Sequence, residues 1–440
     1  MTRQRDFKSL VRERMAKTGE RYTTARTHLL ARTIRHSQPA KAFPGVLSGY
    51  DTFGGQQPGT GAIHNVLRFL GIASALGAPP SEAMVNGLCG GPGFLYAVFE
   101  YKGWPPMLTL ALGNRSMPDV YAAQGLSRLG VRLVQHETTI RTAAQKMLDQ
   151  TLDAGTPALC VTDAASLPHY GLPKHFVGGA PHVVAVAGRD GDGYWIDDRQ
   201  AEPLRVTGTQ LADARAAYRK ARNRLVAIEK PQKTPSAAET HAMIAEAIAD
   251  TALRYVEPAV PKSFAVNCGF SGLAKWRDEL TDRKGKRGWP SMFAEGARAY
   301  AALHRAYEDI ECRSTAGGRA FYADFLEEVA GLLGQDRLRR AAAEYREAAT
   351  LWSRVADTIA SCPDEAVRQA CDIADRRVEL NDAVDKATCA EAAGLWQQRQ
   401  KLAERCKLGR DAAVTLYEEM ASQVDGILRT ETRAVELLKR

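Results

Sequence analysis

Apolar residues recur with two different periods along the chain, and this pattern separates an amino-terminal part from a carboxyl-terminal part. In the first part, helical stretches alternate with short apolar runs rich in β-branched residues. In TGAIHNVLRFLGIASALG, Ile63, Val66, Leu67 and Leu70 form one apolar stripe, which predicts a helix. The continuous apolar runs TPALCVTD and PHVVAVAG predict buried strands. We therefore expect an α+β domain over residues 45–230.

After this domain the pattern becomes almost wholly helical. The stretch EKPQKTPSAAET contains prolines and lysines, and it predicts a linker, which we place at residues 231–260. Beyond it, segments such as RLRRAAAEYREAATLWSRVADTIA carry an apolar residue every three or four positions without a strict heptad. A helical bundle over residues 261–440 is therefore the expected second domain.

A short basic arm precedes both domains. Residues 1–36 hold ten Lys or Arg and three acids, so they carry +7 of the chain's net charge of +8. The spacing of Phe7, Leu10 and Val11, a break at TGE and a second helical pattern predict a small helical hairpin. We expect this arm to stay solvated or to dock an acidic partner, and its charge would suit a carrier protein or a nucleic acid.

Composition excludes several classes of protein. No apolar run reaches the roughly 20 residues of a membrane span, and no apolar core follows the basic start as in a secretory signal, so we expect a cytoplasmic protein. The eight cysteines include no C-x-x-C pair, which opposes a zinc ribbon or a disulfide scaffold. His169, His175 and His182 lack the spacing of metal ligands on a helix. We expect no metal and no other cofactor.

The glycine-rich stretch GLCGGPGF matches neither of the common phosphate-binding patterns. It lacks the Lys-Ser or Lys-Thr of a P-loop and the glycine spacing of a dinucleotide-binding fingerprint. Glycines let the backbone approach another group closely. Gly90, Gly91 and Phe94 are therefore candidates for the wall of a substrate channel.

A histidine and two aspartates at the ends of a predicted β-hairpin are the main candidates for acid–base chemistry. They lie in GGAPHVVAVAGRDGDGYWIDD. A five-residue loop at 188–192 would place His182 across from Asp198, whereas a two-residue loop at 191–192 would put Asp197 on the histidine's face. A carboxylate beside an imidazole fixes its tautomer and stabilises the imidazolium, as a general base requires. Both registers, and a purely structural role for the histidine, stay open on the residues alone.

Several stretches resemble one known family, the amino-terminal domain of the butirosin-biosynthesis acyltransferase BtrH followed by a helical domain of unknown function. They are IHNVLRFLG, PPSEAMVNGLCGGPGFLYA, SLPHYG, PHVVAVAGRDGDGYWIDDR, FSGLAKWRDELTDRKGKRGWPSMF and IECRSTAGGRAFYADFLEE. The resemblance covers most of residues 45–360. It implies a papain-like fold for the α+β domain, with His182 as the base and Asp198 as its orienting partner, in agreement with the five-residue loop.

The nucleophile that this family uses is missing at its expected place. Family members usually carry a His-Cys pair seven residues before the asparagine that matches Asn65, and this chain has Gln57 and Pro58 there. A proline cannot attack a thioester. Either Thr60 at the helix start or Cys89 in the glycine turn could replace the cysteine. Direct transfer without an acyl-enzyme, and binding without chemistry, need no nucleophile.

The resemblance implies transfer of an acyl or aminoacyl group from a carrier-protein thioester to an amine, in specialised metabolite biosynthesis. Gln56 or Gln57 could contribute an oxyanion site near the helix start. The expected partners are an acyl carrier protein or a small-molecule amine acceptor, and the helical domain favours a homodimer. Two alternatives stay open: a catalytically inactive scaffold that binds a peptide or carrier protein, and a peptidase or amidase that uses Thr60 or Cys89.

Overall fold

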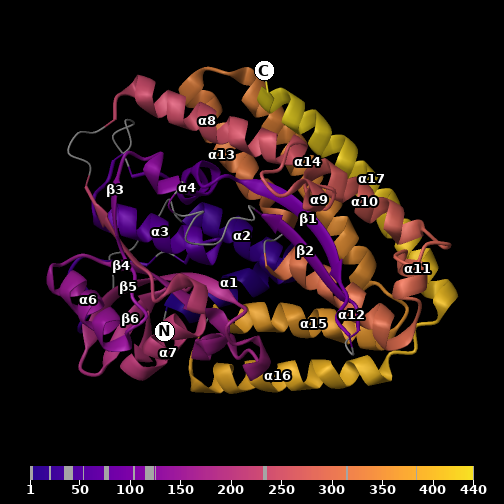
Figure 1. The fold of residues 1–440 in the computed structure, drawn as a ribbon, viewed down its shortest axis with the longest axis horizontal. Helices are drawn as coiled ribbons and strands as arrows, with labels where there is room; N and C mark the ends of the chain where they lie inside the picture. The colour runs from indigo at the N-terminus through magenta and orange to yellow at the C-terminus, as the bar shows by residue number, and fades with distance from the viewer. Residues whose placement is uncertain are drawn as a thin grey trace. The chain divides into compact units, whose positions relative to one another are not determined.

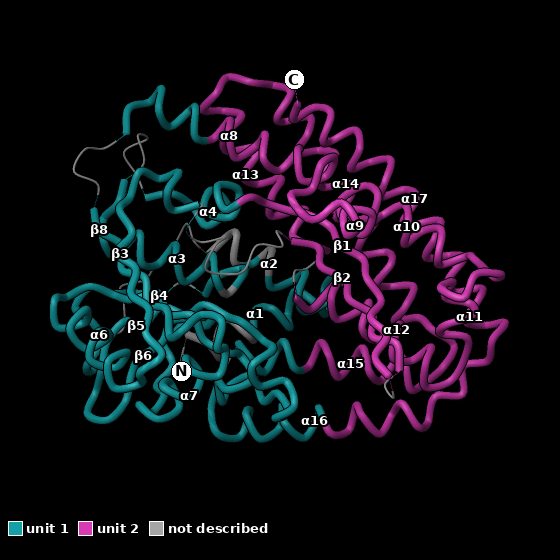
Figure 2. The backbone as a smooth tube through the Cα atoms, in the orientation of Figure 1, with its two compact units in different colours: residues 1–89, 116–243, 377–396 teal, residues 90–115, 244–376, 397–440 magenta. Residues whose placement is uncertain are grey.

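The computed structural model describes residues 3–18, 21–33, 43–52, 54–73, 79–102, 105–113, 123, 125–230, 235–313, 316–382 and 384–439 (Figure 1). The chain forms two compact units (Figure 2). Unit 1 comprises residues 1–89, 116–243 and 377–396, and unit 2 comprises residues 90–115, 244–376 and 397–440. Both units are therefore discontinuous in the sequence.

Unit 1 is built around an antiparallel sheet with the strand order β3-β8-β4-β5-β6-β7. Its strands are β3 (Arg132–His136), β4 (Ala158–Asp163), β5 (Pro181–Asp190), β6 (Gly193–Asp197), β7 (Leu204–Thr207) and β8 (Leu225–Glu229). Its helices include α1 (Arg3–Thr18), α2 (Tyr22–Thr33), α3 (Pro58–Phe69), α4 (Glu82–Leu88), α6 (Arg141–Asp153) and α7 (Gly208–Ala217). Three short 3₁₀ turns, η1 (Ala164–Ser166), η2 (Pro168–Tyr170) and η3 (Lys174–Phe176), lie between β4 and β5. The predicted basic arm is thus a pair of helices that belongs to unit 1.

Residues of β5 alternate between two hydrophobic cores, one on each face of the sheet. Val183, Ala185 and Ala187 lie in the core that α3 forms with the sheet, whereas Val184 and Val186 lie in the core formed with α6 and α7. This alternation is the expected result of the two-residue period of a strand. Helix α3 therefore covers one face, and α6 and α7 cover the other.

The β5–β6 hairpin has the shorter of the two expected loops. A turn of Gly191 and Asp192 joins the two strands. Of the two alternatives, the five-residue loop at residues 188–192 is therefore wrong and the two-residue loop is confirmed. Without a further irregularity, the observed turn would place Asp197 on the face of His182.

A β-bulge in this hairpin brings Asp198 to the face of His182. The register shifts by one residue between Val186 and Gly188, and such a shift exchanges the faces of the residues beyond it. The backbone of Gly45 lies against the bulge, and a Cβ on Gly188 would lie 2.1 Å from the Gly45 carbonyl oxygen. A glycine is therefore required at the bulge.

Unit 2 combines a β-hairpin with a set of helices. Strand β1 (Pro92–Phe99) pairs antiparallel with β2 (Met107–Gly113). The helices include α9 (Lys262–Ala265), α10 (Gly269–Thr281), α11 (Trp289–Met292), α12 (Gly296–Tyr307), α13 (Arg319–Leu333), α14 (Asp336–Ala360) and α17 (Arg410–Lys439). The unit boundaries fall within α8 (Ala237–Val256), α15 (Glu365–Leu380) and α16 (Lys386–Arg405). Helices α14 and α17 run side by side (Figure 1).

A buried guanidinium joins several elements in the core of unit 2. Arg319 has no exposed side-chain surface, and it donates to both carboxylate oxygens of Glu431, at 2.7 and 3.2 Å. It also donates to the carbonyl oxygens of Leu112 and Gly93 and to the hydroxyl of Tyr255. These contacts tie α13 to β1, β2, α8 and α17. A buried charge with this many partners is a structural feature, since an unpaired one would be costly.

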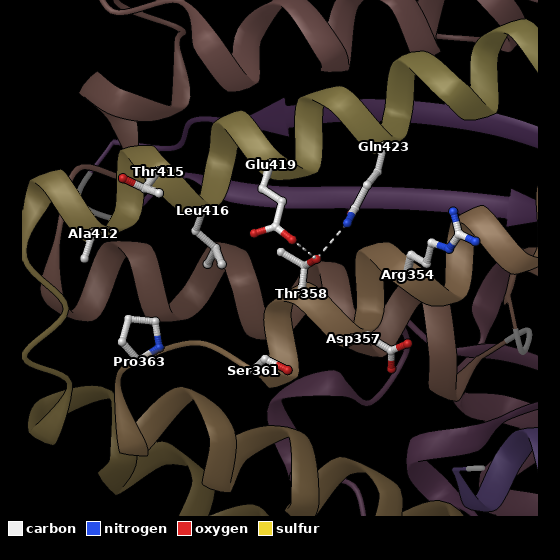
Figure 3. A pocket seen from close by; sticks show the side chains of 10 residues that line it. All are labelled: Arg354, Asp357, Thr358, Ser361, Pro363, Ala412, Thr415, Leu416, Glu419 and Gln423. Atoms are coloured by element: carbon white, nitrogen blue, oxygen red, sulfur yellow. Dashed lines mark hydrogen bonds between the residues drawn. The ribbon is translucent and has the colours of Figure 1, made fainter. Parts of the chain in front are cut away.

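Unit 2 also carries an open groove of about 560 Å³ between α14 and α17 (Figure 3). In the groove the Thr358 hydroxyl donates to Glu419 at 3.0 Å and accepts from Gln423 at 2.8 Å. Arg354 and Asp357 add one charge of each sign. The described side chains that line the groove include none of the predicted site residues.

The sheet-containing amino-terminal part and the helical carboxyl-terminal part are both present, as the two sequence periods predict. The predicted boundaries, however, do not coincide with the two units. The β1–β2 hairpin, expected within residues 45–230, belongs to unit 2, and residues 377–396, expected within 261–440, belong to unit 1. The region expected as a linker, 231–260, contains helix α8. The predicted domain ranges stay a prediction, and the compact units of the structure are discontinuous in the sequence.

Candidate active site

His182 and Asp198 are in hydrogen-bond contact in unit 1. His182 Nε2 lies 2.9 Å from Asp198 Oδ1. An ionised carboxylate only accepts hydrogen bonds, so Nε2 carries the proton and Nδ1 is the basic nitrogen of the neutral ring. The Asp198 side chain is fully buried, whereas 14% of the His182 side chain is exposed. The pair therefore has the arrangement of a general base with an orienting carboxylate.

Two further side chains donate to Asp198. His169 Nε2 and the Tyr170 hydroxyl reach its Oδ2 at 3.0 and 2.8 Å. The Tyr170 oxygen also lies 3.2 Å from His182 Nε2 and can accept from it. Burial alone would raise the pKa of Asp198, but the positive charge that His182 carries when protonated and the hydrogen bonds from both histidines outweigh burial and hold this pKa below its ordinary value. Asp198 therefore stays ionised, with three donors that fix its orientation.

A clamped loop carries His169 and Tyr170 to this position. Asp163, the last residue of β4, accepts three backbone N–H bonds, each of 3.0 Å, from residues 165, 178 and 180. These bonds close the loop that contains η1, η2 and η3. From the sequence, His169 was weighed only as a metal ligand, and Tyr170 had no predicted role. The signal that could have identified both was their place in SLPHYG, one of the stretches that resemble the family.

Asp197, the neighbouring aspartate, faces the other side of the sheet. Its Oδ2 accepts from the Tyr50 hydroxyl at 2.6 Å and from Asn65 Nδ2, on α3, at 2.9 Å. Its Oδ1 and the Asn65 Oδ1 are buried and have no hydrogen-bond partner among the described residues. Burial raises the pKa of Asp197 to about 7, although both hydrogen bonds oppose the rise. The two adjacent carboxylates thus lie in environments that favour opposite protonation states.

A buried carboxylate caps the start of α3. Glu82, the first residue of α4, accepts from the backbone N–H groups of Gln56 and Gln57 at 2.9 and 3.1 Å and from the Thr60 hydroxyl at 3.0 Å. Burial raises the pKa of Glu82, and these hydrogen bonds oppose the rise. The groups that we expected to provide an oxyanion site or a nucleophile therefore bind a carboxylate of the chain itself. Glu82 was not among the residues predicted for the site.

The candidate base and the candidate hydroxyl nucleophile have separate surroundings. The Thr60 side chain is 1% exposed and donates to Glu82. His182 has the same strand parity as Val184 and Val186, so its side chain belongs to the face that α6 and α7 cover. Helix α3, with Thr60, covers the opposite face. The structure brings together His182 with Asp198, and Thr60 with Gln56 and Gln57, as two distinct groups.

Cys89 lies in the core on the α3 side of the sheet. Its side chain is 1% exposed, and a Cβ on Gly125 would lie 2.1 Å from its sulfur. Burial raises the pKa of the Cys89 thiol to about 12, against the opposing charge of Arg128. A thiol in this state is a poor nucleophile, because the thiolate is the reactive form.

Gly90, Gly91 and Phe94 belong to unit 2, where they pack inside. The Gly90 carbonyl accepts from the Thr251 hydroxyl and from Arg254. A Cβ on Gly91 would lie 2.4 Å from the Tyr322 ring. Phe94 is 3% exposed, with its ring centroid 6.0 Å from that of Trp276 and 5.8 Å from that of Trp352. Their substrate-binding role stays a prediction, and this packing gives them a structural one.

Two further features are absent from the described ranges. No group of three or more His, Cys, Asp or Glu side chains there is arranged to hold a metal ion. No helix in that part of the chain is both long and apolar enough to cross a bilayer.

The fold and the site define an α+β protein with a carboxylate-bound imidazole on an antiparallel sheet and a substantial helical part. Residues 57–199 match the family model described as Butirosin biosynthesis protein H, N-terminal, and residues 209–387 match a Domain of unknown function (DUF4872). The chain therefore carries a butirosin-H amino-terminal domain followed by this domain, and the resemblance seen in its motifs is confirmed. No curated protein matches the chain.

Proposed function

We propose that the chain transfers an acyl or aminoacyl group from a carrier-protein thioester to an amine, on a papain-like domain, in the biosynthesis of a specialised metabolite. The match to the butirosin-H family supports the biosynthetic role. The observation that carries the chemistry is the 2.9 Å contact between His182 Nε2 and Asp198 Oδ1. It leaves Nδ1 of a partly exposed imidazole as the proton acceptor.

The proposed reaction is a direct transfer. Nδ1 of His182 takes a proton from the amine as the amine nitrogen attacks the thioester carbonyl carbon. The new C–N bond forms, the C–S bond breaks, and the imidazolium returns its proton to the departing carrier thiolate. The products are an amide and the free carrier thiol, so atoms and charge balance. Ionised Asp198 stabilises the imidazolium while it exists.

Direct transfer suits this chain better than an acyl-enzyme. Pro58 stands where the family has its cysteine. The Thr60 hydroxyl is bound to Glu82, and the Cys89 thiol is buried with a raised pKa. A route without a covalent intermediate requires only a base and a site that holds the two substrates close together.

A second candidate function is binding without chemistry, through the same domain, of a peptide or carrier protein. One observation favours it. The Glu82 carboxylate uses the N–H groups of Gln56 and Gln57, which are the donors that an oxyanion would need near the start of α3.

The test is incubation of the full chain with acyl- or aminoacyl-carrier thioesters and a panel of amines, followed by mass spectrometry of the products and of the intact protein. His182→Gln is expected to lower the transfer rate about 10²- to 10⁴-fold, the usual contribution of a general base. His175→Gln is the matched control, because His175 lies exposed in the same loop and outside the cluster around Asp198.

The outcomes separate the candidates. Turnover without a protein adduct, lost in His182→Gln and kept in His175→Gln, supports direct transfer. An adduct that disappears in Thr60→Ala or Cys89→Ser shows a substituted nucleophile and contradicts the direct route. Carrier binding without turnover for any thioester supports the scaffold. We further propose a homodimer, which light scattering of the full chain tests.

A further inference from the structure

One arginine of the amino-terminal helix pair reaches into the interior of unit 1. Arg26, on α2, has a side chain that is only 4% exposed. Its Nε lies 2.8 Å from both carboxylate oxygens of Asp382, just after α15. Tyr22, one helical turn earlier, donates to Asp382 at 2.8 Å. Helix α2 is therefore held by a buried charge pair as well as by apolar contacts.

The same guanidinium joins the two loops that carry the candidate site. Arg26 Nη2 donates to the Gly55 carbonyl at 3.1 Å and to the Arg199 carbonyl at 3.3 Å. Gly55 directly precedes the two glutamines whose N–H groups bind Glu82. Arg199 directly follows Asp198. One side chain of the arm thus bridges the start of α3 and the strand end that holds the orienting carboxylate.

Asp382 ties this bridge to the site from its other side. Besides Arg26, it accepts from Arg199 Nη2 at 3.3 Å, and Gln200 Nε2 donates to the neighbouring Asn381 carbonyl at 2.8 Å. Buried Arg26 and largely buried Arg199 thus share one buried anion. Such a set is stable only while its partners stay together, because an isolated buried charge is strongly unfavourable.

We infer that Arg26 and Asp382 are positioning residues of the candidate site, so that the arm is an integral part of it and not a detachable docking segment. This inference rests on the proposed function for its consequence, since the loop that the pair holds presents Asp198 to His182. Neither residue lies within the butirosin-H match at residues 57–199. The arm and the loop after α15 would complete a site that this domain does not build alone.

The test reads the tautomer of His182 in the full chain with ¹⁵N-labelled histidine. The ¹⁵N shifts of the two ring nitrogens report which one carries the proton, and we expect the wild type to show the Nε2–H form. Arg26→Gln and Asp382→Asn should lose this signature and give a mixture of tautomers. Arg26→Lys keeps the charge, but its single nitrogen cannot replace both Nε, which binds Asp382, and Nη2, which binds the two carbonyls, so it should recover the signature only in part.

The matched control is Arg12→Gln. Arg12 belongs to the same arm and contacts Glu379, but 57% of its side chain is exposed. It should leave the His182 signature unchanged. If Arg26→Gln or Asp382→Asn folds and shows the wild-type signature, the inference is overturned. Asp382→Asn keeps the side chain's shape, so it provides the test if Arg26→Gln does not fold. The readout needs no substrate, so the transferase proposal can fail while this one stands.

Discussion

Replacing Asp198 by asparagine removes the charge from the centre of the candidate site while keeping the side chain's shape. In the wild type the carboxylate accepts from His182, His169 and Tyr170 at 2.8 to 3.0 Å. An asparagine accepts through one oxygen only, and its amide N–H groups would face side chains that are themselves donors. The imidazole of His182 would then lose the partner that keeps its proton on Nε2.

The expected cost in stability follows from burial. Asp198 is fully buried, and a hydrogen bond to a charged group contributes about 1.5–3 kcal/mol, so loss of the ionised acceptor should cost at least about that much. That is a large share of the roughly 5–15 kcal/mol that stabilises an ordinary domain. Because the folded-state pKa of Asp198 is depressed, its contribution is present above the ordinary pKa of 3.8 and is lost as the pH falls below it. The difference between wild type and variant should therefore shrink on acidification.

Urea unfolding at neutral and acidic pH measures the stability term, and the carrier-thioester assay measures the transfer rate. We expect the rate of Asp198→Asn to fall about 10²- to 10⁴-fold. The matched control is the adjacent residue: Asp197→Asn makes the same chemical change on the opposite face of the sheet and should leave the rate within a few fold. If the two variants behave alike in both assays, the assignment of Asp198 as the orienting carboxylate is refuted.

Three further predictions concern single side chains. Burial raises the pKa of Asp197 from 3.8 to about 7 in the folded state. The wild type should therefore lose stability, by roughly 4 kcal/mol at most, as the pH rises between these two values. Urea unfolding at several pH values should show a weaker dependence of stability on pH for Asp197→Asn. Arg319→Lys keeps the charge but loses the planar guanidinium that binds both oxygens of Glu431, so it should lower the free energy of unfolding by more than about 1 kcal/mol. A smaller loss, measured by thermal unfolding, would contradict the role of these contacts. Glu82→Gln removes an anion from the start of α3 and should lower the free energy of unfolding, measured with denaturant, by about 1 kcal/mol. An unchanged free energy of unfolding would show that the Thr60 hydroxyl and the two backbone N–H groups do not depend on this carboxylate.

The amino-acid sequence by itself determined the features that depend on neighbours in the chain. The helical period of Ile63, Val66 and Leu67 and the apolar run around Val184 predict a helix and a buried strand, and both are present as α3 and β5. Amphipathic spacing and β-branched runs act within a few residues, so they can be read from the sequence directly. The motifs likewise identified the family, because they are short stretches with a specific residue order.

The partner of His182 was predicted only in part. The resemblance pointed to Asp198, and the structure pairs the two, but through the two-residue turn, which on its own would favour Asp197, and an unforeseen bulge. The residues around the bulge do not predict it, because it depends on how Gly188 packs against the backbone of Gly45, which is far away in the sequence. Register in a hairpin shifts faces with every residue, so this one tertiary contact decides which aspartate meets the histidine.

Only the tertiary structure decided what surrounds the candidate site. Glu82 reaches the start of α3 from the next helix, and Arg26 reaches Asp382 across 356 residues of sequence. Charged side chains at such positions read as ordinary surface residues, because the sequence does not show burial or the partner that makes burial of a charge tolerable. The same holds for the division into units, since a segment joins whichever core buries its apolar face, wherever that core lies along the chain.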